Sequence, residues 1–289
     1  MFQFEVPKID YDRYSNRQLA AVPLAVLGVA LLVIAGWWVF TGAPANLGIV
    51  FTGGTEAHLT TPGDVTAGDV AETVGGDPSV REVQNEGDSR EYIATSKLEE
   101  TDALRDRIRE AGYDIRSLQS RSASFGGSSQ VTALFGLLAA FGGMSLLVFG
   151  LFRTFVPSIA VVISAFSDIV IPIAAMNLLG VDLTLGTVAA LLMLIGYSVD
   201  SDILLNNHIL RRSGGFEEST YRAMQTGVTM TLTSLAAMAV MAVVAWLFAI
   251  PLLPQIGLVL VVGLTADLMN TYMLNLSLLR WYVFEGVAR

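Results

Sequence analysis

The chain has no cysteine and, among its 289 residues, only two lysines, Lys8 and Lys97, and two histidines, His58 and His208. Without cysteine it can form no disulfide, thiolate metal site or thiol nucleophile. The histidines lie in different regions, which argues against a zinc site built on imidazole. The sequence also lacks a phosphate-binding loop and a nucleophile with its base. We therefore predict a protein that is not an enzyme and that holds no metal or cofactor.

Charge is also scarce, because only 15% of the residues are charged and 53% are hydrophobic. The mean hydropathy is +0.58. These values are too apolar for a soluble domain of this length. They predict an α-helical protein that crosses a lipid bilayer several times.

Most of the charge lies in residues 42–130, which hold 15 Asp and Glu against 8 Lys and Arg, a net charge of −7. Such a surface repels nucleic acid, so we expect no nucleic-acid partner. Seven of the eight basic residues are arginine. An acidic, lysine-poor domain suits high salt, where screening weakens its self-repulsion. We therefore expect a halophilic source; the alternative is an ordinary acidic extracytoplasmic domain.

Six apolar runs are long enough to cross the bilayer, which takes about 20 residues. The first is residues 19–41, and residues 131–281 are expected to form a bundle of five more helices. Within that bundle the predicted spans lie near 131–151, 156–179, 183–208, 226–249 and 255–280. Ala43-Pro44-Ala45 mimics a signal-peptidase site, but the run before it exceeds a signal-peptide core of about 7–15 residues. We therefore predict that the first span is retained.

The block of residues 42–130 has the pattern of a small α+β domain between the first and second spans. Strands are predicted near 55–60, 80–84, 92–96 and 113–120, and helices over 64–74 and 99–111. This β-α-β-β-α-β order is that of a ferredoxin-like domain. A linker rich in serine and glycine, residues 122–129, is expected to lead back to the membrane.

Lysine and arginine in short loops mark the cytoplasmic side of a membrane protein. Here they lie in the amino-terminal tail, at Arg153, in the predicted loop of residues 209–225 and at the carboxyl end. The short loops near 180–182 and 250–254 contain neither residue type. We therefore predict cytoplasmic tails of residues 1–18 and 282–289, and an extracytoplasmic domain of residues 42–130 in a multi-pass protein of the cytoplasmic membrane.

Four aspartates interrupt the predicted spans: Asp168, Asp200, Asp202 and Asp267. Each costs about 2.5–3.5 kcal/mol in hydrocarbon on insertion scales. Three of them, Asp168, Asp200 and Asp267, lie near mid-membrane on three different helices. Asp200 and Asp202 are two residues apart, so they point to nearly opposite sides of one helix.

Two interpretations of these aspartates stay open. They can carry protons, since no lysine or arginine lies at this depth to pair with them. Alternatively, they can hold helices together through hydrogen bonds to neighbouring polar side chains. The candidate hydrogen-bond partners are Ser164, Asn177, Thr233 and Asn270.

Three sequence motifs resemble those of the SecF family, membrane subunits of the protein-export machinery related to the resistance-nodulation-division transporters. The first is F-x-G-G, with Phe51, Gly53 and Gly54. The second is the stretch Ser164–Asp168 in the third span. The third, in the fourth span, begins with Gly196, Tyr197 and Ser198 and runs on through Asp200 and Asp202.

The chain departs from the bacterial SecF pattern at two places. The fourth-span acid is Asp200, followed by Ser201, whereas bacterial members have Asn-Asp there, so the acid lies about 100° further round the helix. Thr229 stands where bacterial members carry a fifth-span arginine. This pattern looks like an archaeal variant, and Asp200 matches the acid in the corresponding span of SecD, the partner subunit.

The resemblance implies a SecF-like subunit that helps preproteins cross the cytoplasmic membrane. Its implied partners are a SecD-like membrane subunit, the protein-conducting channel and the preprotein substrates, and its implied energy source is the proton gradient. Two alternatives stay open. One is a half-size small-molecule exporter, and the other is a scaffold of the translocon that transports nothing itself.

Overall fold

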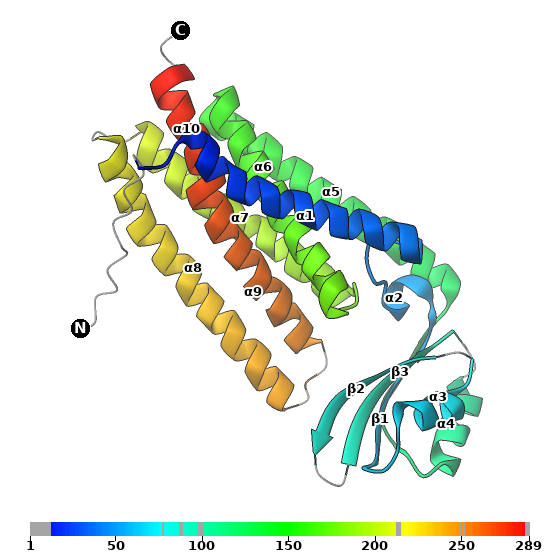
Figure 1. Ribbon diagram of the computed structural model, residues 1–289. Helices are drawn as coiled ribbons and strands as arrows, with labels where there is room; N and C mark the ends of the chain where they lie inside the picture. Colours follow the sequence, from blue (N-terminus) through cyan, green and yellow to red (C-terminus); the bar gives the residue numbers. More distant parts are fainter. Residues whose placement is uncertain are drawn as a thin grey trace. The chain divides into compact units, whose positions relative to one another are not determined.

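The computed structural model describes residues 13–76, 78–86, 89–97, 101–211, 215–248, 250 and 252–286 (Figure 1). The chain divides into two compact units. The membrane unit consists of Met1–Asn46 and Phe135–Arg289, and the soluble unit consists of Leu47–Leu134. Within the described residues, six helices are long and apolar enough to cross a membrane. The predicted α-helical membrane protein with one small α+β unit after its first span is therefore confirmed.

The membrane-length helices follow the predicted order. They are α1 (Asn16–Thr41), α5 (Ala123–Phe152), α6 (Phe155–Leu179), α7 (Leu185–Arg211), α8 (Phe216–Leu247) and a last span composed of α9 (Leu253–Met269), η2 (Asn270–Asn275), α10 (Leu276–Trp281) and η3 (Tyr282–Gly286). In the membrane unit α6, α7 and α9 pack against one another, α1 lies against α6, and α8 lies against α7 and α9 (Figure 1).

Helix ends differ from the apolar runs that predicted them. Helix α1 begins at Asn16 rather than residue 19, because Ser15 precedes it as the N-cap and forms a capping box with Gln18 of its first turn. Helix α8 begins at Phe216, ten residues before the predicted span, and its first turns contain a Glu218–Arg222 ion pair. The connection predicted over residues 209–225 is therefore too long. Hydropathy marks the part of a helix that suits hydrocarbon, whereas caps and ion pairs extend the helix beyond it.

The last span is not a regular α-helix. Two π-helical segments interrupt it, η2 at Asn270–Asn275 and η3 at Tyr282–Gly286. A π-turn holds more residues than an α-turn, so it changes which side chains face a neighbouring helix. Every residue of η2 except Met273 is buried. This segment therefore lies in the interior of the bundle.

The soluble unit has the predicted β-α-β-β-α-β order. After the short helix α2 (Ile49–Thr52) come β1 (Gly54–Pro62), α3 (Ala67–Val74), β2 (Ser79–Glu86), β3 (Ser89–Ser96), α4 (Thr101–Glu110) and β4 (Asp114–Arg121). The sheet has the order β2-β3-β1-β4, and each neighbouring pair is antiparallel. Alternate residues of β1 and β3 pack with α3 and α4. That core contains Ala57, Leu59, Val70, Val74, Tyr92, Ala94, Leu104 and Ile108.

The flexible linker predicted over residues 122–129 is wrong, because α5 is helical from Ala123 onward. The reason is a contact with the F-x-G-G segment. The Gln130 side-chain amide donates to the Phe51 carbonyl at 2.6 Å. A Cβ on Gly126 would lie 2.7 Å from that same carbonyl oxygen. Glycine therefore lets the start of α5 approach the Phe51 backbone, and this contact fixes a segment whose composition suggested a linker.

Candidate functional site

Three of the four predicted aspartates meet in the interior of the membrane unit. Asp168 on α6, Asp202 on α7 and Asp267 on α9 are each at most 1% exposed. Within the described residues no salt bridge reaches any of them. Their hydrogen-bond partners are neutral side chains. We call these three carboxyls and the hydroxyl and amide groups that bind them the carboxyl cluster.

Asp168 joins α6 to two other elements. The Ser198 hydroxyl of α7 donates to Asp168 Oδ2 at 2.5 Å. The Asn270 amide of η2 donates to Asp168 Oδ1 at 2.6 Å. Both carboxyl oxygens of Asp168 are therefore bound by a short hydrogen bond from a neighbouring helix.

Asp202 and Asp267 share a hydroxyl. Thr271 Oγ1 lies 2.9 Å from Asp202 Oδ1 and 3.4 Å from Asp267 Oδ1. The Ser201 hydroxyl lies 2.9 Å from Asp267 Oδ1 and 3.2 Å from Thr271 Oγ1. The Asn275 amide adds a bond to Asp202 Oδ1 at 2.8 Å. Since a hydroxyl carries one hydrogen and accepts others, Ser201 and Thr271 can connect the two carboxyls by exchanging roles.

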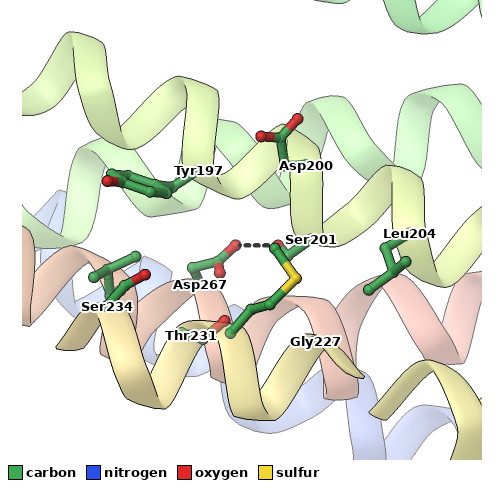
Figure 2. Close-up of a pocket in the computed structure, with 10 residues that line it drawn as sticks. Tyr197, Asp200, Ser201, Leu204, Gly227, Thr231, Ser234 and Asp267 are labelled. Atoms are coloured by element: carbon green, nitrogen blue, oxygen red, sulfur yellow. Dashed lines mark hydrogen bonds between the residues drawn. The ribbon is translucent and has the colours of Figure 1, made fainter. Parts of the chain in front are cut away.

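Asp200 lies apart from this cluster. Its side chain is exposed, whereas Asp202 is fully buried. The two therefore face different sides of α7, as predicted. Asp200 lines a groove between α7, α8 and α9 with a cavity volume of about 100 Å³. Figure 2 shows Ser201 and Asp267 pointing toward each other in this groove, with Tyr197 and Thr231 beside them.

Asp267 links the groove to the interior. It lines the groove and also accepts the Ser201 hydrogen bond of the carboxyl cluster. A path of hydroxyl and carboxyl groups thus runs from the groove surface through Asp267 and Thr271 to Asp202. Groups of this kind can hold and pass protons.

Two of the four predicted interhelical partners, Asn270 and Ser164, lie at an aspartate. Asn270 does bind Asp168. Asn177 instead donates to the Pro44 carbonyl at 2.9 Å and accepts from the Asn46 amide. Thr233 donates to the Met230 carbonyl of its own helix. The Ser164 hydroxyl lies beside Asp202 and interacts with its carboxyl at longer range than the hydrogen bonds given above.

Sequence reasoning missed four of the groups that bind the aspartates: Ser198 as a donor, Ser201, Thr271 and Asn275. Two of these, Thr271 and Asn275, follow Asp267 at intervals of four residues, so the polar spacing 267–271–275 marks one face of the last span. That spacing can be read from the sequence and could have indicated these partners. The π-helical turn, which sets how this face meets α7, cannot be read from the sequence.

The residues of two of the three family motifs have different environments. Ser198 binds Asp168, Tyr197 lines the groove, and Gly196 is exposed with nothing near its Cβ position. Gly53 and Gly54 adopt φ angles of 76° and 113°, which favour glycine. A Cβ on Gly54 would also collide with the Ser96 carbonyl. The F-x-G-G segment therefore shapes the backbone where the sheet begins.

Comparison with known proteins gives consistent matches. Residues 103–285 match the family described as protein export membrane protein SecD/SecF, C-terminal. The protein-export membrane protein SecF of Haloferax volcanii is 63% identical over 100% of both chains. SecF of Haloquadratum walsbyi is 59% identical over 100% of both. SecF of Pyrococcus furiosus is 37% identical over 92% of this chain and 91% of its own.

A solved structure shares the fold. It is SecDF, a translocon-associated membrane protein from Thermus thermophilus, with a TM-score of 0.78 and 18% identity. The match covers 98% of this chain, and this chain spans 40% of that protein's length. Two of the sequence relatives are haloarchaeal, in agreement with the halophilic source expected from the acidic, lysine-poor composition. The full-length identity to these relatives and the family match show that the chain belongs to the SecF family of protein-export membrane proteins.

Proposed function

We propose that this SecF-family chain works with a SecD-like subunit beside the protein-conducting channel, helps preproteins complete their passage across the cytoplasmic membrane, and uses the proton gradient to do so. The observation that carries the proposal is the carboxyl cluster. Three carboxyls that have no cationic partner in the described part of the chain lie inside the bundle, and Asp267 connects them to a groove on its surface. A merely structural core needs no such charges, because apolar side chains pack there at lower cost.

The groove is the face proposed for the SecD-like partner. Its lining includes the exposed Asp200 and Tyr197 of α7, together with the half-buried Ser234 and the buried Thr231 of α8. In a bilayer, polar groups at this position are costly when they face lipid, so a partner helix that supplies hydrogen-bond donors fits them better. SecDF, the solved protein with the same fold, is translocon-associated, which supports a similar association for this chain.

The placement of the domains in the membrane is also a proposal. Residues 42–130 form the extracytoplasmic domain, and the strand order β2-β3-β1-β4 supports a ferredoxin-like arrangement. Residues 19–41 form the first span, 131–281 the five-helix bundle, and the tails 1–18 and 282–289 are cytoplasmic. A cysteine introduced at Asp182 should then react with an impermeant thiol reagent added outside the cell. Protection of that cysteine would contradict this orientation.

The proposed proton path consists of Asp168, Asp200, Asp202 and Asp267. Replacing Asp168 or Asp200 by asparagine keeps size and hydrogen bonding but removes the titratable group. Export driven by the membrane potential should then fall severalfold, while expression and co-purification with the partner remain. The Asp102→Asn change in α4 is a matched control, because Asp102 is exposed and its pair with Arg105 lies on the surface.

The alternative role, a scaffold held together by interhelical hydrogen bonds, predicts a different result. Asparagine would then be nearly neutral at both positions, whereas Asp168→Leu would impair assembly by leaving Ser198 and Asn270 without their acceptor. Full export activity in both asparagine variants, at matched expression, would end the proton-path proposal for this subunit.

A further inference from the structure

One buried polar side chain of the membrane unit, Asn177, lies outside the carboxyl cluster. It is 1% exposed and belongs to the last turn of α6. Its amide nitrogen donates to the Pro44 carbonyl at 2.9 Å, and its amide oxygen accepts from the Asn46 backbone N–H at 3.2 Å. We call these two bonds the Asn177 latch. They hold residues 42–46, the segment that follows α1, against the end of α6.

The same segment is bound a second time by the α6–α7 hairpin, which consists of these two helices and the connection of residues 180–184. The Leu183 N–H of that connection donates to the Asn46 carbonyl at 2.6 Å. The Thr184 N–H donates to the Thr187 hydroxyl at 2.7 Å, which ties the connection to the first turn of α7. The segment is therefore bonded to a part of the hairpin that is itself held in place.

Helix α1 ends before this segment and makes one further side-chain bond to it. The helix stops at Gly42, whose left-handed φ of 78° lets the chain turn away. From α1 the Trp37 Nε1 atom donates to the side-chain oxygen of Asn46 at 3.2 Å. Asn46 is the last residue of this part of the membrane unit, and the soluble unit begins at Leu47. The chain thus enters the soluble unit from a point that is bonded to the hairpin.

The hairpin that binds this point also carries two carboxyls of the cluster, Asp168 on α6 and Asp202 on α7. Asn177 follows Asp168 by nine residues, which is about 14 Å along the helix. Pro172 lies between them, yet α6 is one helix from Phe155 to Leu179. Because a packed helix shifts as a unit, a displacement at the carboxyls reaches the latch.

We propose that Asn177 is a positioning residue, which makes the entry of the soluble unit follow the α6–α7 hairpin and not α1 alone. This inference rests on the proposed function, because it takes export to require movement of the helices that carry the carboxyls. An amide side chain suits the role. It offers a donor and an acceptor in a fixed geometry and adds no charge to the membrane unit.

The first measurement tests whether the latch holds the segment. The chain has no cysteine, so Ala45→Cys places a single thiol in the segment, at a position that is 6% exposed. In the purified full chain this thiol should react slowly with a maleimide. Adding Asn177→Ala should accelerate the reaction about tenfold, as expected when two hydrogen bonds that close the segment are lost.

Thr41→Val is the matched control in the same part of the chain. The Thr41 hydroxyl donates to the Trp37 carbonyl at 2.8 Å and to the Ala43 carbonyl at 3.1 Å, so its loss removes hydrogen bonds that do not reach the hairpin. With this change, the labelling rate of the thiol at position 45 should stay close to that of Ala45→Cys alone.

The second measurement tests positioning through export. Asn177→Ala should lower export driven by the membrane potential severalfold, while its melting temperature and co-purification with the partner stay close to those of wild type. In the double variant Asn46→Cys with Asn177→Cys, a short bifunctional thiol reagent replaces the latch by a covalent link. Export should be low before linking and should recover after it, because the link restores the position without the hydrogen bonds. If Asn177→Ala did not fold, this comparison within one protein would carry the test.

Two results would overturn the inference. An unchanged labelling rate in Asn177→Ala would show that the latch does not hold the segment. Faster labelling with full export, or no recovery of export after linking, would show that the latch does not position the soluble unit for export. The proposed function fails by a different result, which is full export in both Asp168→Asn and Asp200→Asn, whatever the labelling rates are.

Discussion

Both units of the molecule bury apolar side chains, but among the described residues only the membrane unit buries carboxyls. The core cluster of the soluble unit is formed by apolar residues, and its charged groups, such as the Arg116–Glu91 pair, lie outside that core. In the membrane unit, carboxyls lie inside, while Leu146 and Phe135 are 76% and 73% exposed. Each unit thus buries the groups that are unfavourable in its expected surroundings, which are apolar side chains in water for the soluble unit and carboxyls in lipid for the membrane unit. The soluble unit is stabilised by removing apolar surface from water, whereas hydrogen bonds and close packing hold the membrane unit together.

The largest effect is expected in the apolar core of the soluble unit. Leu104 of α4 is fully buried against the sheet. Leu104→Ala should lower the free energy of unfolding of this unit by about 2–5 kcal/mol, because it removes buried methyl groups and leaves a cavity. Hydrogen exchange of β1 and β3 in the full chain measures this change.

The control for that prediction lies on the same sheet. Val83 of β2 is 39% exposed. Val83→Ala should change the free energy of unfolding by less than about 0.5 kcal/mol. Equal protection of the strands in wild type and Leu104→Ala would contradict the view that apolar burial holds this unit.

A smaller loss of stability is expected in the membrane unit when an apolar side chain replaces a buried polar one. Asn270→Leu removes the amide that binds Asp168 Oδ1. It should destabilise the bundle by about 1–3 kcal/mol, because a buried carboxyl oxygen then loses its donor. Denaturation of the purified chain, followed by the fluorescence of Trp37 and Trp246, reports the change.

Thr233→Val is the matched control for the bundle. Thr233 is exposed, and its hydroxyl binds the backbone of its own helix. Its loss should change stability by less than about 0.5 kcal/mol. If Asn270→Leu stabilised the bundle instead, hydrogen bonding would not distinguish its core from that of the soluble unit.

The same contrast explains which features could be predicted from the sequence. Long apolar runs predicted the six spans, because hydrocarbon surrounds a span. The spacing of apolar residues predicted the strands and helices of the soluble unit, because one face of each element packs in the core and the other faces water. Helix starts were missed at Asn16, where the capping box of Ser15 extends α1, and at Ala123, where the contact with Phe51 holds the start of α5.

The partners of the aspartates were harder to predict. A polar side chain in a span indicates that a hydrogen-bond partner is needed, but it does not indicate which helix supplies that partner. Asn270 was predicted correctly as a partner, whereas Asn177 binds the chain just after α1. The π-turn η2 decides how Thr271 and Asn275 reach Asp202, and hydrophobic periodicity does not reveal such a turn.

The smallest effect is expected at a charged side chain of the soluble unit. Asp69 caps α3, and the Thr66 hydroxyl and the Thr66 backbone amide both donate to its carboxylate. These bonds lower the pKa of Asp69 below its ordinary value of 3.8. A lowered pKa contributes stability that is present above the ordinary value and is lost as pH falls through the folded-state value. The soluble unit should therefore lose this contribution below about pH 4, and Asp69→Asn should remove that part of the pH dependence. Thr66→Ala should move the pKa of Asp69 back toward 3.8, because the Thr66 hydroxyl is the largest cause of the shift.

Titration of the Asp69 carboxyl by NMR measures its pKa in wild type and in Thr66→Ala. Glu72→Gln, on the next turn, is the control, because it changes a charge and leaves the cap intact. An identical Asp69 pKa with and without the Thr66 hydroxyl would show that the cap does not set it.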